Sequence, residues 1–240
     1  VGRLDDPRIV IELLTTKNKD RAEELTEKCI NLNNKRRYMT DKIYSQAENS
    51  IKTIDKVASH FLVVANNDWN NGIIGLVASR LLDRYQRPIA VLGMGKNGYL
   101  RGSVRSNGLI KVNHALDSCK DILVNYGGHE AAGGFTIMEK DIENLTKRLN
   151  KYASKLFNIK DLSSKIEPEV FLPLEKINLE FYNKLDEIGP FGIGNKKPLF
   201  WTRNCKILKM DLINEKHLKI LIHNGKQTVT GIYWNFNLKI

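Results

Sequence analysis

The sequence predicts an α/β protein with three consecutive parts: a long connector helix, an α/β domain with a mixed sheet, and a partial β-barrel. An apolar stripe at helical spacing runs through residues 18–52, strand-like and helix-like segments alternate over 54–158, and short strands with tight turns follow residue 168. We therefore expect the parts to cover residues 1–53, 54–158 and 168–240, with a polar linker over 159–168.

The first part contains one unusually long helix. After a loop and a short helix within residues 1–16, Asn18 or Asp20 can cap a helix that runs to about Lys52. At 1.5 Å per residue such a helix spans roughly 50 Å. It is either a coiled-coil or bundle helix or a connector between domains. The thin apolar stripe favours the connector, because it cannot form a core. The stripe consists of Leu25, Cys29, Leu32, Met39, Ile43 and Ala47.

The second part alternates strands and helices. Residues 61–65 and 89–92 are apolar runs typical of buried strands, and residues 70–85 between them repeat apolar side chains at the helical period. Lys96-Asn97-Gly98 has the composition of a hairpin turn, so residues 99–105 should form a third strand beside the second. The domain is completed by a short helix at 112–119, a glycine-rich stretch at 127–134, a strand at 135–137 and an amphipathic helix at 142–156.

The third part consists mainly of short strand-forming runs. A helix at 179–188 and a loop rich in glycine and proline at 189–195 precede them, and Asn224-Gly225 between two runs is a strong hairpin signal. The runs cover residues 199–212, 217–223 and 228–234. These strands are too few to close a barrel, so we expect the barrel to be truncated at Ile240 or completed by further residues.

The chain is basic, with 38 lysines and arginines against 27 aspartates and glutamates and a net charge of +11. The charge rises from +1 over residues 1–50 to +4 over 51–150 and +6 over 151–240, which favours salt-sensitive binding of nucleic acid. No run of 18 apolar residues is present, so we expect no membrane span. Cys29, Cys119 and Cys205 are far apart and form no CxxC pair, which predicts free thiols and a cytoplasmic protein.

Two short segments could carry chemistry. The first is Gly127-Gly128-His129-Glu130-Ala131-Ala132-Gly133-Gly134, where the glycines let the backbone approach an anion and His129 can donate to a phosphate oxygen. If Glu130-Ala131-Ala132 starts a helix, its N-terminal dipole adds to the attraction. A glycine-rich turn with a structural histidine explains the same residues equally well.

The second segment is Gly102-Ser103-Val104-Arg105-Ser106, on the third expected strand. Because side chains alternate along a strand, Ser103 and Arg105 share a face, where a hydroxyl beside a guanidinium suits a terminal phosphate. An edge strand exposed to solvent is the alternative for this segment.

In their order along the chain, these segments resemble the RecJ exonucleases of the DHH phosphoesterase superfamily. NGIIGLVASRLLDRYQRPIAVL, GSVRS and GGHEAAGG resemble the DHH-associated domain. GRLDDP with the long helix resembles the end of the catalytic domain and its connector, and PFGIGNKKPLF resembles the start of the OB-fold. The resemblance implies the C-terminal part of a 5′→3′ exonuclease specific for single-stranded DNA, which acts in DNA repair and recombination by metal-dependent hydrolysis of phosphodiester bonds.

The resemblance also implies roles for individual residues. His129 would be the catalytic residue, in contact with the scissile phosphate. Trp201 and Trp234, together with Phe200 and Tyr233, would stack on bases unless they belong to the barrel core. The residues that would bind the substrate and its terminal 5′ phosphate are Arg3, Ser103, Arg105, Ser106, Gly127 and Gly128.

The metal and the partners follow from the same resemblance. Mn²⁺ or Mg²⁺ would be held by the DHH domain, whose ligands have no counterpart in this sequence, so we expect no metal in this chain and no activity from it alone. The implied partners are single-stranded DNA with a 5′ end and a single-strand-binding protein or helicase. We expect a monomer without membrane contact.

Two other interpretations remain. One is a different phosphoesterase with the same associated domain, acting on short oligonucleotides or cyclic dinucleotides, and the long connector and barrel argue against it. The other is a non-catalytic single-strand-binding or scaffold relative, and the intact GSVRS and GGH segments argue against that.

Overall fold

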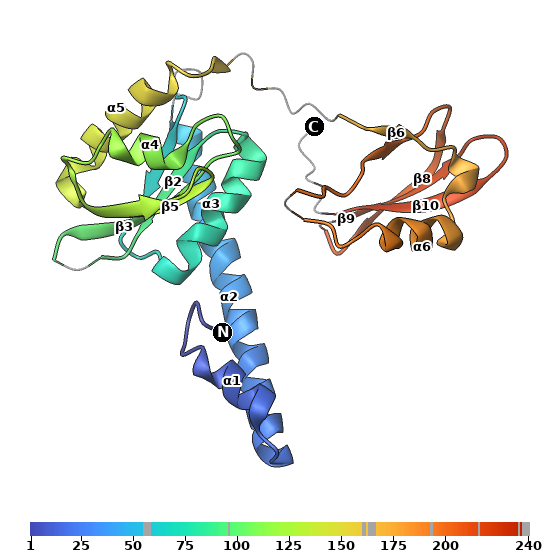
Figure 1. Ribbon diagram of the computed structural model, residues 1–240, viewed down its shortest axis with the longest axis horizontal. Coiled ribbons are helices and arrows are strands. Elements are labelled where there is room, and N and C mark those ends of the chain that lie inside the picture. The colour runs from blue at the N-terminus through green and yellow to red at the C-terminus, as the bar shows by residue number, and fades with distance from the viewer. Residues whose placement is uncertain are drawn as a thin grey trace. The chain divides into compact units, whose positions relative to one another are not determined.

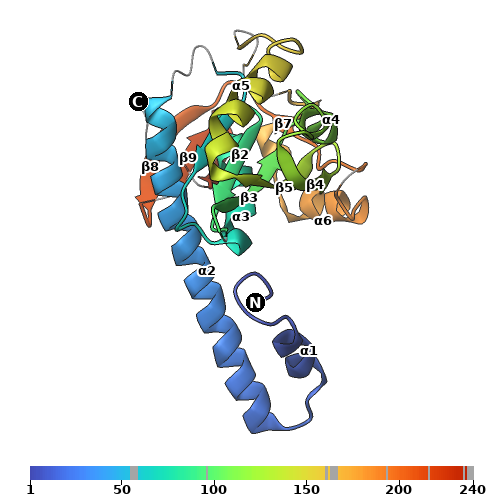
Figure 2. The same cartoon turned by 90° about the vertical axis from the view of Figure 1, so that its left-hand side faces the viewer.

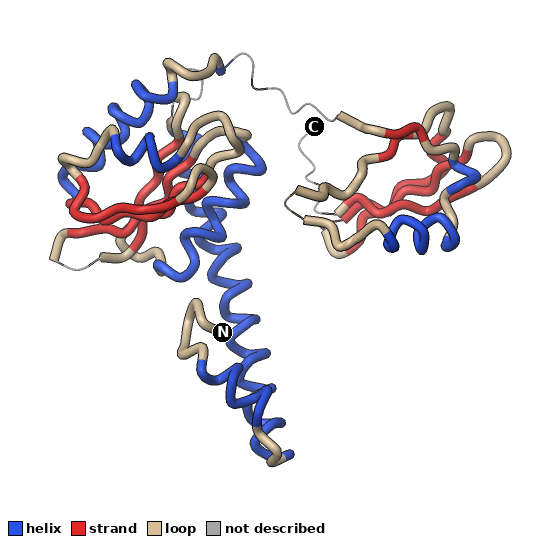
Figure 3. The backbone as a smooth tube through the Cα atoms, in the orientation of Figure 1, coloured by secondary structure: helices blue, strands red, loops and turns tan. Residues whose placement is uncertain are grey.

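A computed structural model describes residues 1–54, 59–95, 97–159, 162, 167–192, 194–215, 217–234 and 236 of the chain. The chain divides into two compact units, Val1–Ser164 and Lys165–Ile240. Figure 3 distinguishes the helices and strands of both units along the backbone. Lys96 of the expected turn, Ile193 of the glycine- and proline-rich loop and most of the linker at 159–168 lie outside the described residues.

Two helices begin the first unit, α1 (Arg8–Thr15) and α2 (Lys19–Thr53), and α2 confirms the long helix. The side-chain oxygen of Asn18 accepts the backbone N–H of Arg21 at 3.0 Å and caps α2. α1 lies along the N-terminal part of α2, as the two views in Figures 1 and 2 show. Within the described residues, no helix is both long and apolar enough to cross a bilayer. The buried positions of α2 are Leu25, Thr40, Ile43, Ala47 and Ile51.

A five-stranded mixed sheet with the order β1-β2-β3-β5-β4 forms the centre of the first unit, which confirms the predicted α/β domain with a mixed sheet. β1 (Leu62–Ala65) and β2 (Ile89–Gly93) are parallel. They are connected by α3 (Asn71–Tyr85), whose first turn is capped because the side chain of Asn70 accepts the N–H of Gly72 at 2.8 Å.

The remaining strands extend the sheet in antiparallel order. β3 (Tyr99–Arg105) pairs with β2 and with β5 (Ala132–Met138), and β4 (Leu123–Gly128) pairs with β5 at the edge. β4 was not expected from the sequence, because all its residues except Leu123 are exposed and it shows no alternation of apolar and polar side chains.

The two faces of the sheet are covered unequally. One face packs across all five strands against α4 (Val112–Asp117) and α5 (Ile142–Ala153), which follows a 3₁₀ turn at Glu139–Asp141. On the other face, α2 and α3 form a core with β1 and β2 only. The side chains of β3, β5 and β4 on that face are exposed or half-buried. This half of the sheet therefore forms an open floor beside α3.

The described strands of the second unit form two small sheets. β8 (Lys206–Ile213), β9 (His217–His223) and β10 (Thr228–Tyr233) make an antiparallel sheet, and Gly225 at φ 95° confirms the predicted hairpin between β9 and β10. The expected strand at 199–212 is divided in two, because residues 202–205 are not in a strand. The other elements are β6 (Val170–Phe171) paired in parallel with β7 (Phe200–Trp201), a 3₁₀ turn at Leu174–Lys176 and α6 (Leu179–Glu187).

Candidate phosphate site on the open half of the sheet

The alternation of side chains along β3 places one set of polar groups on the open floor. Leu100 and Val104 are buried in the core, whereas Arg101, Ser103 and Arg105 lie on the other face and are exposed or half-buried. Ser103 and Arg105 therefore share a face, as the strand period predicts. Arg101 belongs to the same set by the same period, and the sequence argument missed it.

A cavity of about 430 Å³ lies on this floor beside α3, and we call it the arginine pocket. Nη1 of Arg105 donates to Oγ of Ser103 at 3.1 Å and to the carbonyl of Val104 at 2.7 Å. Nε of Arg105 donates to Oγ of Ser79 on α3 at 3.3 Å, so the guanidinium is held between helix and sheet. The charged and hydroxyl-bearing lining consists of Arg3, Arg101, Arg105, Ser103 and Thr136, and Asn71 and Asn125 add amide groups.

The arginine pocket carries positive charge without compensation. None of its described lining residues is acidic. In the part of the chain that the structure describes, Arg3, Arg101 and Arg105 form no ion pair, whereas Arg148 on α5 pairs with Asp121. Burial and the nearby charge of Arg3 lower the pKa of Arg105. A bound anion would offset both effects, so the electrostatics favour an anionic ligand here.

Two glycines of α3 make room for the pocket. A Cβ on Gly72 would overlap the backbone carbonyl of Arg3, so only glycine lets the N-terminal segment come this close. Nη1 of Arg3 in turn donates to the carbonyl of Gly72 at 3.4 Å. A Cβ on Gly75 would lie 3.1 Å from Nη2 of Arg105 and 3.2 Å from Oγ of Ser103. The motif NGIIG thus brings Arg3 of the N-terminal segment together with Ser103 and Arg105 of β3.

Ser106 does not line the arginine pocket. Its side chain is 5% exposed, and its Oγ donates to the carbonyl of Ile110 at 2.9 Å and accepts the N–H of Ile110 at 3.4 Å. The alternation that places Arg105 on the open floor turns Ser106 away from it. Its predicted part in substrate binding is therefore corrected to a structural one, since it holds the loop that precedes α4.

The glycine-rich stretch is a β-hairpin, and the expected start of a helix at Glu130 is wrong. β4 ends at Gly128 and β5 begins at Ala132, and the N–H of His129 donates to the carbonyl of Ala132 at 2.8 Å. Carbonyls in the turn accept the N–H of Ser106 and of Val112, each at 2.9 Å. These bonds from outside the hairpin hold the turn in place, and Glu130-Ala131-Ala132 does not itself start a helix.

His129 lies at the exposed tip of this hairpin. Its backbone neighbour Ala132 is the cross-strand partner of Arg105. Two strand spacings, about 10 Å, therefore separate the backbones of His129 and Arg105. Neither His129 nor Gly127 nor Gly128 lines the arginine pocket. The hairpin places the histidine at the end of the open floor where Arg105 lies.

In the second unit, the predicted stacking residues are at the surface. Trp201 is 43% exposed, and its ring centroid lies 4.9 Å from that of Phe171. The guanidinium carbon of Arg203 lies over the Phe171 ring, 5.2 Å from its centroid. Trp234 is 63% exposed, with its ring edge-on to His217 at 4.8 Å. Of the other two candidates for base stacking, Tyr233 is exposed to solvent. The ring of Phe200 packs against that of Phe181, with 5.3 Å between the ring centroids.

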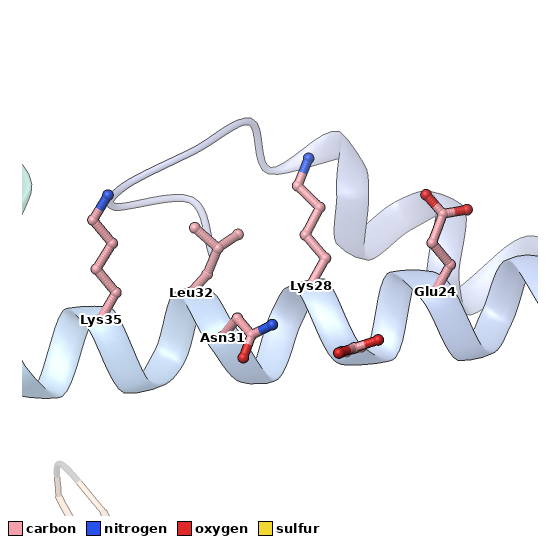
Figure 4. A pocket seen from close by; sticks show the side chains of 6 residues that line it. Glu24, Lys28, Asn31, Leu32 and Lys35 are labelled. Atoms are coloured by element: carbon pink, nitrogen blue, oxygen red, sulfur yellow. The ribbon is translucent and has the colours of Figure 1, made fainter.

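A second hollow, shown in Figure 4, lies along α2 and has a different character. Side chains of both signs line it, and Lys28 among them pairs with Asp5 at 3.5 Å. It lacks the uncompensated charge of the arginine pocket. Its lining residues are Glu24, Glu27, Lys28, Asn31, Leu32 and Lys35.

The described residues do not fit a metal centre. Among them, no group of three or more histidine, cysteine, aspartate or glutamate side chains is placed to hold an ion. The chemistry that these residues offer is the binding of anions through guanidinium, hydroxyl and amide groups.

Two family models match the chain. A DHHA1 domain matches residues 55–155 and a RecJ OB domain matches residues 169–240. The first match contains the sheet, the pocket-forming strand β3 and the histidine hairpin, and the second contains the surface tryptophans. The fold and the matches therefore define a DHHA1 domain followed by a RecJ-type OB domain.

Comparisons over the whole chain identify the particular family. The "Single-stranded-DNA-specific exonuclease RecJ" of Bacillus subtilis (strain 168) is 32% identical over an alignment of 240 positions that covers 98% of this chain and 30% of that protein. Crystal structures of RecJ from Thermus thermophilus with Mn²⁺ and with Mg²⁺ each match all of this chain at a TM-score of 0.78, with 25% and 24% identity. The matches cover 35% and 36% of those chains. The chain represents the C-terminal part of a RecJ-type protein and spans about a third of the length of these relatives.

Proposed function

We propose that this chain binds the 5′-terminal phosphate of single-stranded DNA in the arginine pocket and serves as the strand-holding part of a 5′→3′ exonuclease. The observation that carries the proposal is the set of three guanidinium groups that line one pocket with Ser103 and without an acidic residue. The names of the relatives support the substrate class, and DNA repair and recombination are the processes in which such an exonuclease would act.

A terminal phosphate fits this pocket better than an internal one. A phosphate monoester carries about −1.5 to −2 charges at neutral pH and three strong acceptor oxygens, whereas an internal diester carries one charge. The bonds to Ser103, Val104 and Ser79 leave the two N–H groups on Nη2 of Arg105 for such a group. The hydroxyl of Ser103 and the guanidinium of Arg3 can supply further bonds. Recognition of this group would set the 5′→3′ polarity, because only a chain end supplies it.

A direct comparison of chain ends tests the proposal. The purified chain is titrated with oligonucleotides of one sequence that end in a 5′ phosphate or in a 5′ hydroxyl. We expect clearly tighter binding of the phosphorylated strand, and equal affinities for both strands would overturn the assignment of the pocket.

In this proposal, the metal ion needed for hydrolysis is bound outside this chain, in the full-length protein. Mn²⁺ and Mg²⁺ are present in the T. thermophilus RecJ structures, and the described residues here offer no ligand cluster for them. We propose that another domain of the full-length protein holds the ion, so that this chain alone binds DNA without cleaving it.

His129 is the proposed contact to the scissile phosphate in the full-length protein. We expect His129→Ala to lower single-turnover cleavage about tenfold with little change in DNA affinity, because one hydrogen bond to a charged group is lost at the reacting phosphate. Cleavage is measured with the metal present, and affinity by fluorescence anisotropy. His114→Ala, at an exposed position of α4, is the control. A large loss of affinity with unchanged turnover would contradict this role.

Trp201 is the proposed stacking residue of the OB domain. We expect Trp201→Ala to weaken binding of a 5′-hydroxyl oligonucleotide about fivefold, at the low end of the energies typical of base stacking, because Phe171 already covers part of the ring. Trp201→Phe should retain most of the affinity. Tyr38→Ala, an exposed aromatic residue on α2, should leave it unchanged. If Trp201→Ala binds the 5′-hydroxyl oligonucleotide as tightly as the unchanged chain, Trp201 does not stack on a base.

A further inference from the structure

A second cavity adjoins the arginine pocket on the open floor, and we call it the Tyr99 pocket. Its volume is about 430 Å³, and it shares with the arginine pocket the lining residues Asn71, Arg101, Asn125 and Thr136. The two cavities are therefore parts of one continuous depression. It follows β3 from Arg105 toward the start of the strand at Tyr99.

The side chains that belong to the Tyr99 pocket alone are apolar. Tyr99, Met94 and Val124 come from three different segments and are all partly open to solvent. The amide of Asn71 donates to the carbonyl of Met94 at 2.7 Å and fixes the loop after β2 against α3. An aromatic ring, a thioether and a branched aliphatic side chain around one opening suit a flat ring system.

The spacing along β3 relates the two pockets to each other. Ser103, Arg101 and Tyr99 lie on one face of the strand at intervals of about 7 Å, since each residue advances the chain by about 3.3 Å. One such interval corresponds to the separation between the phosphate and the base of a single nucleotide. A ligand whose phosphate lies beside Ser103 and Arg105 can thus place its base between Arg101 and Tyr99.

We infer that the Tyr99 pocket receives the base of the 5′-terminal nucleotide whose phosphate occupies the arginine pocket. This inference rests on the proposed function, because it takes the arginine pocket as the site of the 5′ phosphate. The base stacks on the ring of Tyr99, and the amides of Asn71 and Asn125 lie at its edges. The site thus recognises a nucleoside 5′-phosphate unit rather than a phosphate alone.

The opposite end of the floor remains available to the rest of the strand. Tyr99 pairs with Met138 at one end of β5, whereas Arg105 pairs with Ala132 at the other end, next to His129. The Tyr99 pocket and the histidine hairpin therefore lie toward opposite ends of the floor. The floor accommodates the base without blocking the path toward the histidine hairpin.

A strand whose first nucleotide lacks its base separates the two pockets experimentally. The purified chain is titrated by fluorescence anisotropy with three oligonucleotides of one sequence. One has a 5′ phosphate and a complete first nucleotide, one has a 5′ phosphate and an abasic first nucleotide, and one has a 5′ hydroxyl. We expect the complete phosphorylated strand to bind about tenfold more tightly than the abasic one, as one stacked base would give.

Variants on both walls test whether this preference arises in the Tyr99 pocket. Tyr99→Ala should abolish the preference for the complete strand and leave the affinity for the abasic strand unchanged, whereas Tyr99→Phe should retain the preference. Val124→Ala, at a position that is 59% exposed and tolerant of substitution, should reduce the preference about threefold. The buried indole of Trp69 reports whether each variant is folded.

The outcomes distinguish this inference from the proposed function. Equal binding of complete and abasic strands, with the preference for a 5′ phosphate intact, would overturn the Tyr99 pocket as a base site and leave the arginine pocket standing. Equal losses on both phosphorylated strands in Tyr99→Ala would overturn it as well. Loss of the preference for a 5′ phosphate in the wild-type chain would overturn the proposed function itself.

Discussion

Arg105→Ala should weaken binding of a 5′-phosphorylated oligonucleotide about 30- to 150-fold and leave binding of the 5′-hydroxyl strand nearly unchanged. The expected loss corresponds to about 2–3 kcal/mol, the upper part of the range for hydrogen bonds between charged groups. Hydrogen bonds to Ser103, Ser79 and Val104 hold the guanidinium of Arg105 in place in the pocket. Little reorganisation is therefore needed when the phosphate binds.

Two further variants sharpen this prediction. Arg105→Lys retains the charge and loses the planar fork, so we expect it to restore only part of the affinity. Arg148→Ala removes a guanidinium that is already paired with Asp121 and should affect both strands little. Arg105→Ala should also reduce the slope of log Kd against log salt by about 0.7 for the phosphorylated strand, as expected for one phosphate contact with a single strand. Equal losses on the two strands would contradict the assignment.

Gly128→Ala should destabilise the first unit by about 2–4 kcal/mol, whereas Gly127→Ala should cost less than about 1 kcal/mol. Gly128 has φ 155°, a conformation that residues with a side chain rarely adopt, and a Cβ there would overlap the carbonyl of Ala132 and lie 2.5 Å from Cα of Gly133. A Cβ on Gly127 would meet no atom within 4 Å. The two adjacent glycines of one motif are thus predicted to differ strongly.

Urea unfolding followed by the fluorescence of Trp69 measures both variants. The ring of Trp69 is buried in the first unit, and its Nε1 donates to Oε1 of Gln46 at 2.9 Å, so its emission reports unfolding of that unit when Trp201 and Trp234 of the second unit are replaced by Phe. Since Gly128 precedes His129 directly, Gly128→Ala in the full-length protein should also lower cleavage. Similar stability of the two variants would show that the hairpin tolerates a side chain at either glycine.

Most helices and strands could be predicted because their causes are local. The stripe of α2, the cap at Asn18 and the alternation in β3 depend on residues a few positions apart. The pairing of Ser103 with Arg105 follows from the same local rule. Arg101 would have followed from it too, had the alternation been extended by two residues.

The order of helices and strands, the basic charge and the motifs that resemble RecJ could all be read from the amino-acid sequence. Which of these residues meet became visible only in the folded chain. Arg3 joins Arg105 because Gly72, far along the chain, leaves space for the N-terminal segment. The glycine stretch is a hairpin rather than a helix because Ser106 and Val112 bond to its turn from outside. Such contacts join segments that are distant in sequence, so they leave no periodic pattern from which they could be predicted.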